Sequence, residues 1–237
     1  MISNQDLFHV HTFRCGHAEK VPDRAYIEKA LELGAKGIWF TDHCPFPGDY
    51  FMRAHRMLYS DLPEYVDTLK ELKKEYSGRI DVHIGLETEY FIKYDEMGYY
   101  KELRENKDIE MLLLGQHMSE LPDGRYSYDL DKEELIEREY KLLGEEMILG
   151  IQSGYFNAVA HPDRIFRKRQ VWDDGMNAMA INIINYAKLA GIPLEQNESS
   201  KAAPNYYRDE FWKLAEGKTD IIRGLDAHWL SEIKKLW

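Results

Sequence analysis

The chain has 237 residues, of which 44% are hydrophobic and 31% charged. This composition is typical of a soluble globular protein and excludes a disordered chain. A formal net charge of −11 argues against a general nucleic-acid binder, because such a protein needs a basic face. There is no long apolar run or signal-peptide pattern, and the two cysteines, Cys15 and Cys44, cannot form a disulfide framework. We therefore expect a cytoplasmic protein that does not bind membranes.

Strand-like and helix-like stretches alternate along the chain. We predict strands at 6–10, 36–41, 79–90, 109–115, 156–160, 192–195 and 220–223. We predict helices at 22–33, 61–76, 95–105, 131–151, 173–190 and 206–216, and residues 230–236 close the chain. This alternation indicates parallel βαβ units, and seven of them without a glycine-rich dinucleotide turn favour a closed barrel over a doubly wound sheet. We expect an α/β fold in one domain, residues 1–237.

Three of the nine histidines lie at the end of the first predicted strand and in the loop after it. Side chains alternate along a strand, so His9 and His11 should share one face, about 6.6 Å apart along the axis, with His17 beyond them. Taken alone, a His-x-His pair is a weak signal and could be a surface feature.

Other potential metal ligands also lie at or just beyond the ends of predicted strands. Parallel barrels gather the C-terminal ends of their strands at one mouth, so side chains there should meet. They are His43, Glu87, His117, His161, Asp226 and His228. Asp42-His43 alone could be a capped turn and Glu87 a paired strand carboxylate, but the joint pattern predicts a metal cluster. We expect His83 to be an interior residue, His55 a surface residue, and both cysteines small buried groups outside the site.

These motifs together resemble the PHP (polymerase and histidinol phosphatase) superfamily over the whole chain. The stretches 40–45, 85–90 and 194–197 are similar to signatures of its histidinol-phosphatase branch. The resemblance implies a distorted (β/α)7 barrel with three divalent ions of zinc, manganese or iron. It also implies a ligand set: His9, His11, Glu87 and Asp226 for one ion; Glu87, His117 and His161 for a second; His17, His43 and His228 for a third.

Three such ions would attract a phosphate group despite the acidic exterior, and a metal-bound hydroxide would be the nucleophile. Arg164 is the candidate phosphate contact, since a guanidinium binds phosphate through forked hydrogen bonds. We assign Arg167, Lys168 and Arg169 to the surface. The weaker candidates for substrate contact are Arg14, Arg56, Glu195 and Asn197, and we expect Asp42 and Asp163 to orient neighbouring imidazoles.

We therefore expect a phosphatase that acts on a small phosphorylated substrate, with histidinol phosphate as the first choice. The stretches 115–118 and 226–229 and the aromatic, basic loop 45–61 differ from the histidinol-phosphatase pattern. One alternative is a PHP-type enzyme that acts on a nucleotide, an oligonucleotide or phosphotyrosine, with base stacking by Phe46, Tyr50, Phe51 or Tyr90. The other is a non-catalytic metal-binding domain, which ligands spread over many strand ends disfavour. The sequence leaves the metal identity and the oligomeric state open.

Overall fold

The computed structural model describes residues 2–48 and 55–237, and the chain divides into two compact units. Unit 1 comprises Met1–Glu87, Asn106–Leu112 and Arg223–Trp237, and unit 2 comprises Thr88–Glu105 and Leu113–Ile222. The order of the strands follows the chain from β1 to β7, and the pairs β1–β2, β2–β3, β4–β5 and β5–β6 are parallel. Within the described ranges, no helix has the length and apolar character needed to cross a membrane.

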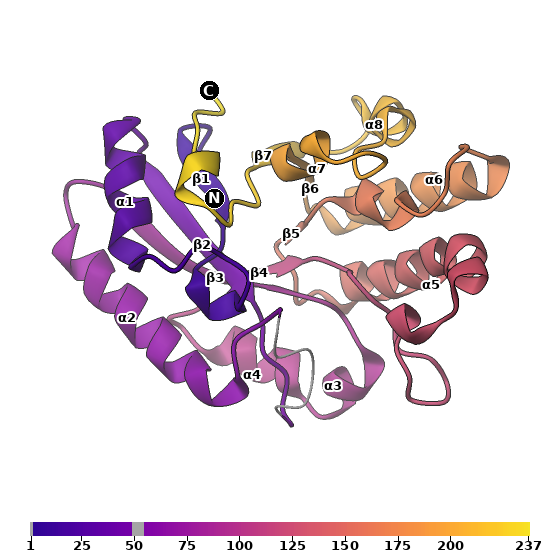
Figure 1. Ribbon diagram of the computed structural model, residues 1–237, viewed down its shortest axis with the longest axis horizontal. Helices are drawn as coiled ribbons and strands as arrows, with labels where there is room; N and C mark the ends of the chain where they lie inside the picture. Colours follow the sequence, from indigo (N-terminus) through magenta and orange to yellow (C-terminus); the bar gives the residue numbers. More distant parts are fainter. Residues whose placement is uncertain (1, 49–54) are drawn as a thin grey trace. The chain divides into compact units, whose positions relative to one another are not determined.

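Unit 1 contains three neighbouring strands and two helices. They are β1 (Asp6–Val10), β2 (Gly37–His43), β3 (Asp81–Thr88), α1 (Asp23–Glu32) and α2 (Leu62–Glu75). Figure 1 shows α1 and α2 lying beside these strands, and an ion pair between Arg24 and Glu75 links the two helices. The apolar side chains of Phe40 on β2 and Leu69 on α2 are completely buried. The strands are therefore covered as parallel strands require.

The segment after β7 returns to β1 within unit 1. The Leu225 N–H donates to the Phe8 carbonyl (2.9 Å), and the Ala227 N–H donates to the His9 carbonyl (3.1 Å). The His11 N–H in turn donates to the Ala227 carbonyl (2.9 Å), and Val10 and Ala227 form a parallel bridge. The first strand and residues 225–227, which are far apart in sequence, are therefore hydrogen-bonded neighbours.

Unit 2 carries the remaining helices and strands, with β4 and β7 crossing the boundary between the units in sequence. They are α3 (Ile92–Glu96), α4 (Tyr99–Glu105), β4 (Met111–Leu114), α5 (Lys132–Ser153), β5 (Ala158–Val159), α6 (Asp174–Ala190), β6 (Leu194–Asn197), α7 (Glu198–Ala202), α8 (Asp209–Ala215) and β7 (Ile221–Gly224). Figure 1 shows α5 and α6 side by side. The side chains of Asp131 and Asp173 cap the N-termini of α5 and α6 by accepting hydrogen bonds from backbone N–H groups. Gly154 and Gly191 end these two helices in the left-handed conformation.

The segment 230–236 contains a short 3-10 helix, Leu230–Glu232. The Glu232 carboxylate accepts the N–H groups of His228 (2.7 Å) and Trp229 (3.0 Å), and the chain is already extended at Ile233. So short a segment gains too few helical hydrogen bonds to offset the cost of starting a helix. The short helix α7, capped by the Asn197 side chain, was not predicted.

Two glycines of α5 give a matched test of packing in unit 2. A Cβ on Gly150 would lie 2.9 Å from Leu114 Cδ2 and 3.0 Å from Tyr90 Cβ, whereas the atoms nearest to one on Gly144 belong to the flexible side chain of Met179. We expect Gly150→Ala to lower the free energy of unfolding by about 1–3 kcal/mol. Gly144→Ala should be close to neutral, because the gain in helix propensity offsets the movement of Met179. Urea unfolding measures both, and equal stability of the two variants would contradict this packing argument.

Candidate metal centre

Irregular backbone positions the ligands of unit 1. The register between β1 and β2 shifts between Leu7 and Val10, and His9 within that interval has a φ of 68°. Asp226 also has a positive φ, 53°. Residues other than glycine adopt this region at an energetic cost, and such residues cluster at functional sites. Regular alternation along β1 is therefore not what brings His9 and His11 together; a bulge does.

Two buried carboxylates lie among the imidazoles of unit 1. Glu87 Oε2 is 3.4 Å from His9 Nε2, 3.5 Å from His11 Nε2 and 3.0 Å from His43 Nδ1. Asp226 Oδ1 is 3.8 Å from His9 Nε2 and 3.3 Å from His11 Nε2. Separations of this size suit atoms that share a metal ion about 2 Å from each of them.

A second group of ligand atoms in unit 1 belongs to His17, His43 and His228, which lie within 4.8 Å of one another. The His17 Nδ1 faces the Cys15 carbonyl (3.0 Å), and the His228 Nδ1 faces the Asp226 carbonyl (3.2 Å). A nitrogen that faces a carbonyl oxygen is the protonated one, so Nε2 of each ring is left as the ligand atom. The structure thus brings together all the predicted ligands that lie in unit 1.

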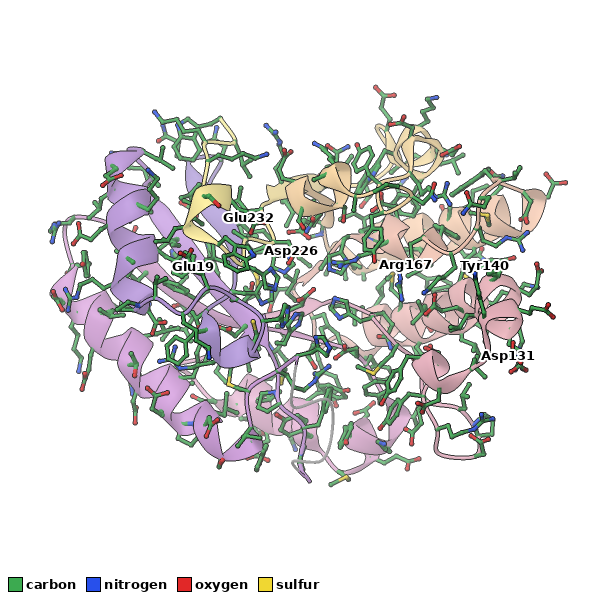
Figure 2. The ribbon with its side chains drawn as sticks, viewed as in Figure 1. Glu19, Asp131, Tyr140, Arg167, Asp226 and Glu232 are labelled. Carbon is green, nitrogen blue, oxygen red and sulfur yellow. The ribbon has the colours of Figure 1, made fainter. Side chains whose placement is uncertain are left out.

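Hydrogen bonds among acidic residues and the backbone hold this group in place. Figure 2 shows Glu19, Asp226 and Glu232 gathered in one region of unit 1. The Glu19 N–H donates to the His228 carbonyl (2.8 Å), and its carboxylate accepts the Leu230 N–H (2.8 Å). The segment after His17 is thereby tied to the segment that carries His228.

The protonation of these imidazoles favours metal binding. Burial, followed by repulsion from His43, lowers the pKa of His11 to about 3, and burial followed by repulsion from His11 lowers that of His228 to about 3. Burial also lowers the pKa of His17. The Nδ1 of His11 and the Nε2 of His228 are buried without a hydrogen-bond partner among the described residues. Buried lone pairs of this kind are costly unless a ligand uses them, so these residues fit a metal.

Unit 2 holds the other two predicted ligands. The rings of His117 and His161 lie 5.1 Å apart, and His161 has a φ of 28°. The His161 N–H donates to Glu195 Oε2 (3.2 Å), which also accepts from the Asn197 amide (3.2 Å). Glu195 and Asn197 are both fully buried, and substrate contact by this pair stays a prediction.

Asp42 and Asp163, which we expected to orient neighbouring imidazoles, accept hydrogen bonds from N–H groups. Asp42 Oδ1 accepts the Thr12 N–H (2.9 Å), and Asp163 Oδ2 accepts the Arg208 N–H (2.8 Å) and Trp212 Nε1–H (2.9 Å). Burial raises the pKa of each carboxyl to about 7. These hydrogen bonds link distant chain segments, and a role of either carboxylate in orienting an imidazole stays a prediction.

The cations near the ligands are engaged by other groups. The Arg14 guanidinium pairs with Asp23 and Glu64, both at 2.9 Å, and Arg56 is buried and donates to the Cys44 carbonyl (2.7 Å). The Arg164 guanidinium lies 4.8 Å from the centre of the Tyr206 ring. Arg14 and Arg56 are thus held by other protein groups, and substrate contact by Arg14, Arg56 or Arg164 stays a prediction.

Arg167 is not the surface residue that we predicted (Figure 2). Its side chain is mostly buried and pairs with the buried Glu139 of α5 (2.9 Å). Of the aromatic residues expected for base stacking, Phe46 and Tyr90 are buried, while Tyr50 and Phe51 lie outside the described residues. The buried rings of Phe46 and Tyr90 pack inside the protein, which does not favour an enzyme that stacks them on a nucleotide base.

The chain is similar to several known proteins. The sequence pattern of the PHP domain family matches residues 8–199. A Deinococcus radiodurans protein named a probable histidinol-phosphatase is 42% identical over 82 residues, covering 35% of this chain and 31% of that protein. Such aligned stretches span about a third of the length of the curated relatives.

Two solved structures share the fold. One is a candidate histidinol phosphatase, HisK, of Listeria monocytogenes, with a TM-score of 0.79, 19% identity and 98% coverage of both chains. The other is the histidinol phosphate phosphatase of Lactococcus lactis in complex with zinc, L-histidinol and phosphate. It has a TM-score of 0.68 and 22% identity, and the match covers 95% of this chain and 86% of that one. The predicted fold class, α/β with seven parallel strands in a TIM-like barrel, is confirmed.

Proposed function

Because the chain belongs to the PHP domain family, we propose that it is a metal-dependent phosphomonoesterase whose substrate is histidinol phosphate. The observation that carries the proposal is the cluster of buried imidazoles and carboxylates in unit 1, drawn from chain segments as far apart as His9 and Asp226. The names of the curated relatives and the histidinol and phosphate bound in the Lactococcus lactis enzyme support this choice of substrate.

We propose three divalent ions of zinc, manganese or iron, since neutral imidazoles with few carboxylates suit these metals better than magnesium or calcium. The ligands would be the predicted ones: in unit 1, His9, His11, His17, His43, Glu87, Asp226 and His228; in unit 2, His117 and His161. Bound divalent ions supply positive charge that attracts a phosphate dianion and makes water a better nucleophile.

The chain's own residues set up this chemistry. His11 and His228 are held neutral by burial, so their lone pairs are available at neutral pH. The carboxylates of Glu87 and Asp226 offset part of the metal charge, and their burial keeps them in one place among the rings. The Arg164 guanidinium is the group that we propose to contact the phosphate oxygens, where it would offset the charge that develops during transfer.

The test is phosphate release by protein loaded in turn with zinc, manganese or iron. We expect kcat/KM for histidinol phosphate to exceed that for nucleoside monophosphates and for a generic aryl phosphate by about 100-fold or more. A preference for a nucleotide would assign the same chemistry to another substrate class. Retained metal with no turnover of any ester would indicate a non-catalytic metal-binding domain.

A further inference from the structure

Glu89, which follows directly after β3, was not among the predicted site residues. Its side chain is 1% exposed, and its Oε1 lies 3.0 Å from Nδ1 of His117. A buried carboxylate is costly unless its oxygens are hydrogen-bonded, so a contact between Glu89 and an imidazole at this distance calls for a functional reason. The only sequence signal was its place two residues after Glu87, within the stretch 85–90.

The direction of this hydrogen bond decides which nitrogen of His117 can bind a metal. An ionised carboxylate has only acceptor sites, so the proton of a neutral His117 must be on Nδ1. The lone pair is then on Nε2, which points away from Glu89 across the ring. A carboxylate paired in this way also limits the rotation of the imidazole.

Other contacts hold the backbone around His117. The Gln116 side chain accepts the Tyr90 N–H (2.9 Å) and donates to the Met118 carbonyl (2.8 Å) and to Glu146 (2.7 Å). Arg167 reaches toward the His117 carbonyl (3.5 Å). These contacts fix the backbone position of His117, but they do not touch its imidazole ring. The contact from Glu89 acts on the ring itself and sets its tautomer.

We propose that Glu89 is a positioning residue, which holds His117 with Nδ1 protonated and Nε2 available to a metal ion. The proposal rests on the proposed function in one respect, that His117 is a metal ligand. We expect Glu89 to strengthen the binding of the ion that His117 holds. Glu146 and Arg167 cannot do this in the same way, because they contact the Gln116 side chain and the His117 carbonyl and not the imidazole ring.

The test is competition for zinc with a chromophoric chelator, which needs no substrate. We expect Glu89→Gln to weaken one bound ion by about 10- to 100-fold and to leave the other ions unchanged. Glu102→Gln makes the same chemical change at an exposed position of α4 and should match the wild type. Glu89→Asp keeps the charge but is one methylene shorter, so it should recover part of the lost affinity.

A second measurement separates positioning from a general structural role. In the metal-free protein with ¹⁵N-labelled histidine, the spectrum of His117 should show the Nδ1–H tautomer, and Glu89→Gln should populate both tautomers because an amide can donate or accept. Unchanged zinc affinity and an unchanged tautomer would overturn the proposal, as would an equal loss of all ions with a lowered unfolding midpoint. If Glu89→Gln does not fold, the same two measurements on Glu89→Asp decide.

The outcome is independent of the phosphatase assignment. Weakened zinc binding without turnover of histidinol phosphate would keep the role of Glu89 and remove the proposed substrate. Turnover of histidinol phosphate with unchanged zinc binding in Glu89→Gln would keep the proposed substrate and remove the role of Glu89.

Discussion

Replacing Glu87 with glutamine should lower kcat/KM for the phosphate ester by about 10³-fold or more and release at least one metal ion. Oε2 of Glu87 lies within 3.5 Å of nitrogens of three imidazoles, those of His9, His11 and His43. The amide of glutamine is neutral, and its NH₂ group would point a donor at a metal ion or at a ring nitrogen. A preorganised charge at the reacting centre typically contributes factors of 10² to 10³, and loss of a metal adds to this.

The control for this variant is Glu71→Gln, the same substitution on the exposed face of α2. We expect it to retain wild-type turnover and metal content. Metal content is measured by elemental analysis of gel-filtered protein, and turnover by phosphate release. Full metal content together with undiminished turnover in Glu87→Gln would show that Glu87 is not a ligand.

The candidate ligands could be selected from the sequence because they lie at or just beyond the ends of predicted strands. The buried run of β4, for example, marks where His117 must lie, and Ala158 and Val159 of β5 do the same for His161. In a parallel α/β fold such strand ends meet, so residue type and position suffice. The backbone geometry could not be predicted in the same way: His9 has a positive φ, and its carbonyl accepts a hydrogen bond from Ala227, a residue far away in sequence.

The ion-pair and hydrogen-bond partners of the candidate side chains also could not be predicted from the sequence. The spacing of Arg14 from His11 and His17 suggested a substrate contact, but Asp23 and Glu64 occupy its guanidinium, and Glu64 is 50 residues away. Asp163 likewise accepts from Trp212, which local spacing gives no reason to connect with it. A charged side chain takes whichever opposite charge or buried donor the fold brings to it, and that choice is set by tertiary contacts.

Removing the metal with a chelator should lower the unfolding temperature by about 8–16 °C and abolish turnover. An ion held at 1,000 times its Kd adds about 4 kcal/mol to the free energy of unfolding, and each kcal/mol shifts the midpoint of a chain of this size by about 2–4 °C. Differential scanning calorimetry before and after chelation measures the shift. Zinc, manganese or iron should restore the midpoint, whereas magnesium and calcium should not. The same midpoint with and without chelator would contradict a tightly bound metal.

The loss of metal with acid should begin well below the usual pKa of histidine. A proton competes with a metal for an imidazole lone pair only near or below the pKa of that imidazole, and burial lowers those of His11 and His228 from 6.5 to about 3. In the metal-free protein the sign is the same: between pH 6.5 and about 3 the unfolded chain binds protons that the folded state refuses, so stability falls as the pH falls. We therefore expect metal content at pH 5.5 to equal that at pH 7.5. Release with a midpoint near 6.5 would mean that ordinary, exposed histidines hold the ions.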